Sequence, residues 1–379
     1  MALTKLQVIT VCTAIALLSS SMEVAFSSSR QRSLSAELIA IAEDSLNAQY
    51  QTLVSGDVEA SLKARPLAHL YRATIANQLN SQVAIRAELK KVKMSYKSFR
   101  TRLVLRDIQV DGDKAQLKAT EVTSMDMDTP PGGPKVTKFS DPHVFDFVNE
   151  GGEWHLVNDV VVRPAPVVEK QQADLPAAPP AKDLAEAKAL KHYNHAVSTR
   201  AATRMFGSYD RVASVAYAKQ YALTYNSAFK HFNNDCTNFV SQSLNAGGWE
   251  MVTGYYTNQD VWWYACALPG GYVCNASYTW GAAYNFRQFL NTSPGNRTVA
   301  AQQLSNLFTG DIIFADWDGP SGHHPDGRVD HVMFVTGKDT DGNLYISQHT
   351  NDRLDRPMAQ VILQETEAQF YGFKVKDSY

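Results

Sequence analysis

Hydrophobic residues first recur at helical spacing along this chain and then alternate with polar residues. A helical series opens at Ser35 and is interrupted at Gly56, and a second helix is predicted from about residue 67 to 91. Residues 99–119 then alternate around an Asp-Gly-Asp turn, and residues 144–162 alternate around a Glu-Gly-Gly turn. Each of these two stretches predicts a β-hairpin. Two helices followed by a strand meander predict an antiparallel sheet with helices on one face.

Residues 33–162 are therefore expected to form an N-terminal α+β domain. The order of its elements resembles that of the NTF2-like and cystatin-like folds, in which a curved sheet wraps a long helix. The sequence of this segment shows no paired acids and no histidine cluster, so it is predicted to be a structural or ligand-docking module.

The composition changes at residues 163–182, where proline and alanine dominate and aromatic residues are missing. Such a run is semi-extended and cannot bury a core, so we expect a linker that tethers two separate domains. Residues 183–379 form the second domain, and helical sequence is expected at 183–203. β-branched and aromatic runs at 310–315, 329–337 and 344–351 predict a small antiparallel sheet. The fold class is α+β.

Cys236 lies at the predicted start of a helix in the second domain. Asp235 stands where an N-cap belongs and Gly247 where a C-cap belongs. Because a helix N-terminus favours a thiolate, we expect a lowered thiol pKa and a reactive nucleophile. The backbone at Asp235 and Cys236 is the expected oxyanion-binding element.

The first 29 residues have the layout of a signal peptide: Lys5, an apolar run at 6–18, and small residues before Arg30. The apolar run is shorter than the roughly 20 residues that cross a bilayer as a helix, so we expect a secreted protein without stable membrane insertion. Cleavage would remove Cys12 and leave three cysteines. Cys266 and Cys274 can close a short disulfide loop, which leaves Cys236 unpaired.

A cysteine nucleophile needs a base from another element, and His331 begins the predicted strand at 331–337. Asp330, the neighbour of His331, should point to the opposite face of the strand and so away from the imidazole. A third polar residue should orient the imidazole. The next strand offers Ser347 and His349 on one face, Gln348 on the other, and Asn351 beyond them.

The motifs at 209–211, 235–242 and 349–351 occur in an order that resembles the "putative amidase domain" family of the NlpC-like, papain-like cysteine hydrolases. The resemblance covers about residues 185–375. It implies a helix packed on a small antiparallel sheet, with Cys236 attacking an amide carbonyl and His331 transferring the proton. It also favours His349 as the third catalytic residue, with Asn351 as the alternative.

Other interpretations compete with that of a cysteine hydrolase. His323 and His324, with nearby aspartates and His331, could hold zinc in a metal-dependent hydrolase, although neither a metal nor a cofactor is predicted. Tryptophans at 262, 263, 280 and 317 could line a groove or lie in the core. A binding module that has lost catalysis is the main alternative. The net charge of −2, with dispersed basic residues, argues against nucleic acid. A peptide or peptidoglycan-like substrate is expected from the extracellular location.

Overall fold

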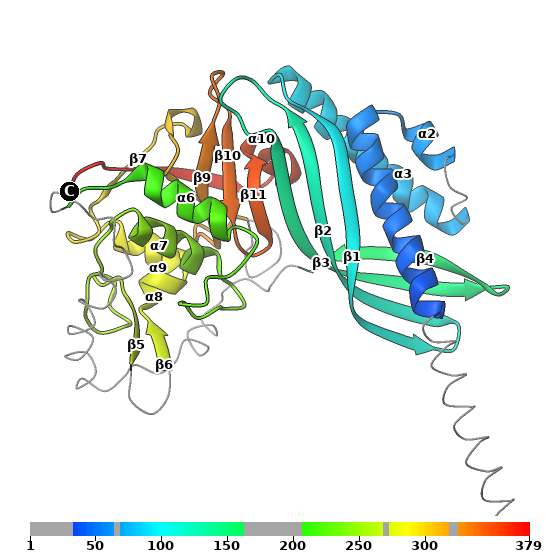
Figure 1. Ribbon diagram of the computed structural model, residues 1–379, viewed down its shortest axis with the longest axis horizontal. Coiled ribbons are helices and arrows are strands. Elements are labelled where there is room, and N and C mark those ends of the chain that lie inside the picture. Colours follow the sequence, from blue (N-terminus) through cyan, green and yellow to red (C-terminus); the bar gives the residue numbers. More distant parts are fainter. Residues whose placement is uncertain (1–32, 64–68, 163–206, 268–272, 318–324) are drawn as a thin grey trace, which may run out of the picture.

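The structure is a computed structural model that describes residues 33–63, 69–162, 207–267, 273–317 and 325–379 (Figure 1). The predicted signal peptide, the linker and the helical sequence at 183–203 lie outside the described residues. Among the described helices, none combines the length and the apolar character that a membrane-spanning helix requires.

The N-terminal unit packs helices on one face of long antiparallel strands, as predicted. Residues 33–55 are helical and are followed by α2 (Val58–Lys63) and α3 (His69–Lys91). The strands are β1 (Ser95–Asp111), β2 (Lys114–Asp128), β3 (Val136–Glu150) and β4 (Glu153–Val161). A core of buried apolar side chains joins the helices to the sheet, among them Leu38, Leu46, Ile75, Leu79, Leu117 and Phe145.

Glycines end the first helix and shape the tight turns of this unit. Gly56 has a φ of 83°, a conformation that an L side chain rarely adopts, and its N–H donates to the Thr52 carbonyl oxygen at 2.7 Å. Gly112 has a φ of 59° and connects β1 to β2, in the position where the sequence predicts a hairpin turn.

The C-terminal unit contains a sheet with helices on both faces. The helices are α6 (Arg211–Tyr221), α7 (Cys236–Ala246), α8 (Tyr278–Gly281), α9 (Ala283–Phe289) and α10 (Met358–Gln364), with a 3₁₀ turn, η2, at Leu304–Asn306. The strands are β7 (Thr298–Ala300), β8 (Ile312–Asp316), β9 (His331–Lys338), β10 (Leu344–Gln348), β11 (Asp352–Pro357) and β12 (Gln369–Val375). A separate hairpin pairs β5 (Tyr264–Ala267) with β6 (Val273–Ala276).

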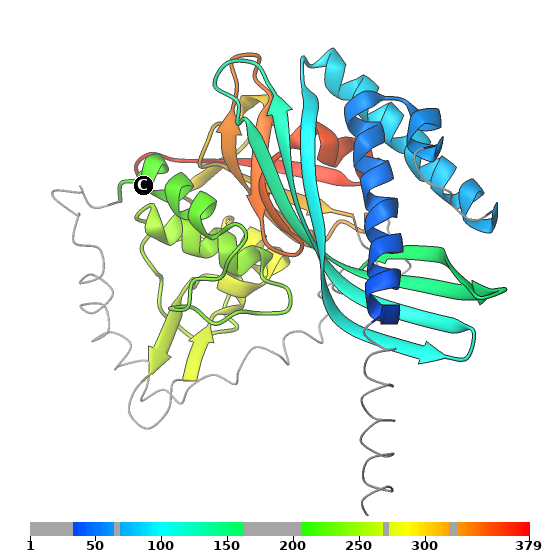
Figure 2. The same ribbon diagram turned by 45° about the vertical axis from the view of Figure 1, so that its right-hand side comes forward.

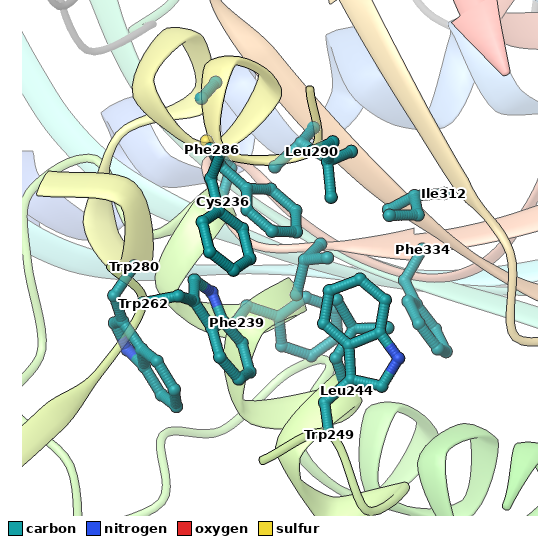
Figure 3. Packing of buried hydrophobic residues seen from close by; sticks show 14 of the residues in the cluster. Cys236, Phe239, Leu244, Trp249, Trp262, Trp280, Phe286, Leu290, Ile312 and Phe334 are labelled. Carbon is teal, nitrogen blue, oxygen red and sulfur yellow. The ribbon is translucent and has the colours of Figure 1, made fainter. Parts of the chain in front are cut away.

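Strand β9 separates the two cores of the C-terminal unit. Its residues Val332 and Phe334 join the aromatic-rich cluster that contains Phe239 and Leu244 of α7 (Figure 3). Met333 and Val335 point to the opposite face of β9 and join the buried cluster that contains residues of α10. The helix that carries Cys236 therefore packs directly on an antiparallel sheet, which agrees with the predicted α+β class.

The two units share one sheet, so the expectation that they are only tethered is wrong. Ten strands form this sheet; the order is β1-β2-β3-β11-β10-β9-β8-β12-β7, and β4 also pairs with β3. One edge of β3 pairs at 138–140 with β11 and at 143–150 with β4. Figure 2 shows β11 running beside β3 at this junction. The composition of the linker predicts an extended connection, but it contains no information about which strand edges meet.

Candidate functional site

Cys236 is the first residue of α7 and is almost completely buried, with 3% of its surface exposed. The predicted helix start and the position of Asp235 before it are confirmed. Cys236 belongs to the same buried, aromatic-rich cluster as Phe286 (Figure 3). The thiol therefore lies between the start of a helix and a densely packed core.

The carboxylate of Asp235 does not cap its own helix. It accepts hydrogen bonds from the backbone N–H of Phe232 and the side-chain amide of Asn238, each at 2.9 Å. Its second oxygen lies 2.7 Å from Nδ1 of His349. Asp235 is 1% exposed, so these bonds replace water around a buried charge.

His349 is held by Asp235 and by the backbone of Tyr221. Its Nε2 lies 2.7 Å from the Tyr221 carbonyl oxygen. Both partners accept, so both ring nitrogens donate and the imidazole is protonated. Burial lowers the pKa of His349, but the hydrogen bond and the charge of Asp235 outweigh it, so the pKa is raised. The ring also packs against Phe239 and Tyr225, with centroids 4.5 and 4.4 Å apart.

The structure thus brings His349 to Asp235, whereas strand alternation predicts a position beside His331. The physical reason is that β10 ends at Gln348. His349 has left the strand, so strand alternation no longer determines the direction of its side chain. Both hydrogen-bonding atoms of its ring are occupied by Asp235 and Tyr221.

His331 begins β9, as predicted, and pairs in register with Ala315 of β8. It is 3% exposed, and its ring stacks on Trp317 with centroids 4.9 Å apart and planes 23° apart. The next residue, Val332, lies in the same buried cluster as Cys236, and its backbone N–H acts to lower the pKa of the thiol. The structure therefore brings Cys236 close to the start of β9.

The pKa of the Cys236 thiol is raised, not lowered as the helix position predicts. Burial is the largest cause, and the charge of Asp235 adds to it. Hydrogen bonds from the Thr237 hydroxyl and from Val332 oppose the shift without overcoming it. A helix terminus stabilises a thiolate by a modest amount, which the loss of water around a buried sulfur exceeds. The resting thiol is therefore neutral at pH 7.

The structure places the remaining candidates around His331 and at the junction of the two units. The Asp330 carboxylate accepts a hydrogen bond from the backbone N–H of Trp317 at 3.1 Å. Asn351, the alternative third residue, is one of the groups that lower the pKa of the Asp141 carboxyl of the N-terminal unit, after the larger effects of burial, which raises it, and of Arg353. Asn351 therefore lies near Asp141.

Three of the four tryptophans considered for a substrate groove belong to the core. Trp262, Trp263 and Trp280 are at most 3% exposed, and their indole N–H groups donate to protein oxygens between 2.8 and 3.0 Å away. This decides their role: they stabilise the fold around α7. Trp317 is partly exposed and packs on His331, so it is the tryptophan of this set that adjoins the candidate site.

Two other sequence predictions fall on residues whose side chains or placement are not described. Cys266 and Cys274 face each other in the β5–β6 register, but their side chains lie outside the described set. The disulfide therefore stays a prediction. The histidines at 323 and 324, proposed as zinc ligands, lie outside the described residues as well.

A buried charged cluster in the N-terminal unit was missed, and the prediction of no histidine or acid cluster there is wrong. Glu121, Asp141 and His143 lie together, with ligand-type atoms within 4.8 Å of one another. Glu121 of β2 stands opposite Asp141 of β3 in the strand register. His143 bonds Glu121 at 3.0 Å and Asp159 at 2.6 Å. Asp141 and His143 share β3, but Glu121 and Asp159 come from other strands, so spacing alone does not reveal the cluster.

Cationic side chains balance the acids of this cluster. Burial lowers the pKa of His143, but hydrogen bonds to Asp159 and Glu121 outweigh that effect and raise the pKa to about 10. Arg353 of β11 binds both oxygens of Asp141, at 2.7 and 2.8 Å. Glutamate, aspartate and histidine are possible metal ligands, but here their donor atoms are engaged by one another and by Arg353.

Comparison with known proteins gives a match for the second unit. Residues 208–373 match a family described as a "putative amidase domain". This match indicates amide hydrolysis as the general class of reaction.

Two curated relatives come from Bacillus subtilis (strain 168), and both are described as uncharacterized. YhbB is 32% identical over 168 residues, which are 44% of this chain and 50% of that protein. YjcM is 31% identical over 160 residues, which are 41% of this chain and 34% of that protein. The chain spans half or less of the length of these relatives.

A solved structure, the intermembrane space region of the chloroplast protein ARC6, is similar over 33% of this chain and 95% of that chain. It is 12% identical with a TM-score of 0.22, a level at which the likeness carries no argument about fold or function.

Proposed function

We propose that the second unit is a cysteine amidase or peptidase with Cys236 as nucleophile and His331 as base. The observation that carries this proposal is that Cys236, the first residue of α7, lies in one buried cluster with Val332, the residue that follows His331 at the start of β9. The Val332 N–H also acts to lower the thiol pKa, which supports the closeness of the two elements that supply the proposed pair. The family match adds the reaction class.

The reaction starts from a neutral thiol, because burial raises the pKa of Cys236. His331 takes the thiol proton while the sulfur attacks the amide carbonyl carbon and forms the S–C bond. The C–N bond then breaks, and His331 returns the proton to the leaving amine. A water molecule, deprotonated by His331, attacks the thioester, releases the acid and restores the thiol.

Charge around the nucleophile fits this sequence of steps. The backbone N–H groups at the start of α7 are the candidates that stabilise the oxyanion. Asp235, the neighbour of Cys236, carries a negative charge that opposes sulfur anion formation. Its pairing with protonated His349 offsets that charge. His349 thus assists the reaction through Asp235 in this proposal.

The substrate that we propose is a peptide or the peptide part of peptidoglycan, and the protein is proposed to be secreted. Both ideas rest on the signal-like layout of residues 1–29 and on the amidase match.

The burial of Cys236 in an aromatic core favours a second candidate function. A free cysteine in such surroundings also suits a binding module in which the thiol only fills space. The two functions differ in whether the thiol is required for bond cleavage.

Digestion of purified peptidoglycan, followed by mass spectrometry of the fragments, tests the proposal. Wild type should release new amine and carboxyl ends, whereas Cys236→Ser and His331→Ala should release none above background. His155→Ala, which removes a histidine of β4 in the other unit, is the matched control and should digest like wild type. Full digestion by Cys236→Ser would exclude this cysteine as nucleophile. A folded wild type that cleaves nothing would favour the binding module.

A further inference from the structure

The turn between β10 and β11 is held from the N-terminal unit. Arg353 donates from both terminal nitrogens to the two oxygens of Asp141, at 2.7 and 2.8 Å. Burial raises the pKa of this carboxyl, but the charge and hydrogen bonds of Arg353, and to a smaller extent Asn351, lower it. Asp141 and Arg353 are 7% and 12% exposed at their side chains, so the pair is shielded from water. A single carboxylate thus holds Arg353 at the start of β11, directly after this turn.

The same turn holds the start of α7 from its other side. The hydroxyl of Thr350 accepts a hydrogen bond from the Asp235 N–H at 2.8 Å. His349 binds the Asp235 carboxylate at 2.7 Å. Residues 349–353 therefore stand between Asp141 and the residue that precedes Cys236.

Asp141 is itself fixed within the sheet. Its neighbour Ser140 pairs in register with Asp352 of β11, and Glu121 stands directly across from Asp141 on β2. His143 binds Glu121, and the Arg353 guanidinium lies 5.1 Å from the centre of the Phe139 ring. The carboxylate is therefore a rigid anchor and not a surface charge free to move.

We propose that the N-terminal unit positions the nucleophile: Asp141 fixes the 349–353 turn, and this turn fixes Asp235 and with it the first turn of α7. The proposal rests on the proposed function, because it assigns Asp141 and Arg353 as positioning residues for catalysis by Cys236. The family match at 208–373 contains the turn but not Asp141, so the anchor comes from outside the matched region.

The test uses full-length protein with Asp141→Ala and Asp141→Asn. Displacement of a catalytic group by about 1 Å can reduce the rate about 100-fold, so Asp141→Ala should lower the rate at saturating peptidoglycan by about 10- to 100-fold. The peptidoglycan concentration at half-maximal rate should change little, because no contact with substrate is lost. Asp141→Asn keeps an acceptor for Arg353, so its rate should lie between the rates of wild type and Asp141→Ala.

Asp146→Ala is the matched control. Asp146 lies on the same strand and accepts hydrogen bonds from Gln116 and Asn158 within the N-terminal unit. This variant should keep the wild-type rate. A wild-type rate in Asp141→Ala would overturn the proposal, and so would an equal loss in Asp146→Ala.

A double variant separates positioning from general destabilisation. If Asp141 acts through the turn, His349→Gln and Asp141→Ala interrupt the same connection, and the double variant should be no slower than the slower single variant. Losses that multiply in the double variant would show two independent effects and would overturn the proposal.

Alkylation of Cys236 by iodoacetamide, followed on the peptide that contains it, gives a readout that needs no hydrolysis. Asp141→Ala should react several-fold faster than wild type at a temperature where circular dichroism shows both folded, because a loosened turn opens the start of α7. If wild type hydrolyses nothing but this change occurs, the proposed function fails and the positioning stands. If Cys236→Ser is inactive while Asp141→Ala hydrolyses and alkylates like wild type, the positioning fails and the function stands.

Discussion

Replacing Arg353 with methionine should destabilise the protein strongly, because it leaves the Asp141 carboxylate buried without its cation. Removing one partner of a buried ion pair typically costs about 3–5 kcal/mol. The pair here is bidentate and shielded, and the substitution also removes the guanidinium from the Phe139 ring. We therefore expect a loss in the upper part of that range in the free energy of unfolding.

Urea unfolding measures this loss with two signals. Five of the six tryptophans lie between residues 249 and 317, so fluorescence reports the C-terminal unit, while circular dichroism reports both. Wild type should unfold in one transition by both signals, because the sheet is continuous. Arg353→Met should lower the midpoint and separate the two curves.

Two further variants test the reasoning. Asp141→Leu combined with Arg353→Met removes both charges and should recover much of the loss, since buried pairs can be replaced by apolar groups at little cost. Lys97→Met breaks an exposed pair with Asp128 and should cost less than about 1 kcal/mol. A cost below about 1 kcal/mol for Arg353→Met, or a double variant as unstable as the single, would refute the role of the pair.

Two other predictions follow from the structure. Because the pKa of His143 is raised from 6.5 to about 10 by Asp159 and Glu121, its contribution to stability is fully present below pH 6.5 and is lost as pH rises toward 10. The urea midpoint of wild type should therefore fall between pH 7 and 10, and His143→Gln should flatten that slope; an unchanged slope would contradict the assignment. Gly247→Ala would place a Cβ 2.4 Å from the Tyr209 ring and 2.8 Å from Ser214, so it should cost about 1–3 kcal/mol in urea unfolding. Gly327→Ala is the control without a steric clash, because a Cβ there meets nothing within 4 Å. Its φ of 88° means that any cost of this variant comes from backbone strain alone.

Sequence patterns predicted the elements whose signals are local. The Asp-Gly turn at 111–113, the helix that starts at Cys236 and the strand that starts at His331 all occur as expected. In each case a cap, a turn residue or an alternating run fixes the conformation of residues that are adjacent in the chain.

Features that depend on register or on distant contacts were missed. Glu121 occupies an inward position of β2 among Leu117, Ala119 and Met125, so an acid on an otherwise buried face was the available signal. Its partner could not be identified, because the register that pairs it with Asp141 is set by the whole hairpin. The prediction of a lowered thiol pKa failed for a related reason. The burial of Cys236 depends on packing against α9 and β9, which no local motif reveals.

The pairing of β3 with β11 also protects an exposed strand edge. An unpaired edge offers a row of free N–H and C=O groups to any other chain, and proteins usually cover or interrupt such edges. A fragment limited to the matched residues 208–373 would present the edge of β11 without β3, together with an Arg353 deprived of its carboxylate. We therefore expect a fragment with these boundaries to associate more readily than the full chain, because the N-terminal unit covers the edge of β11.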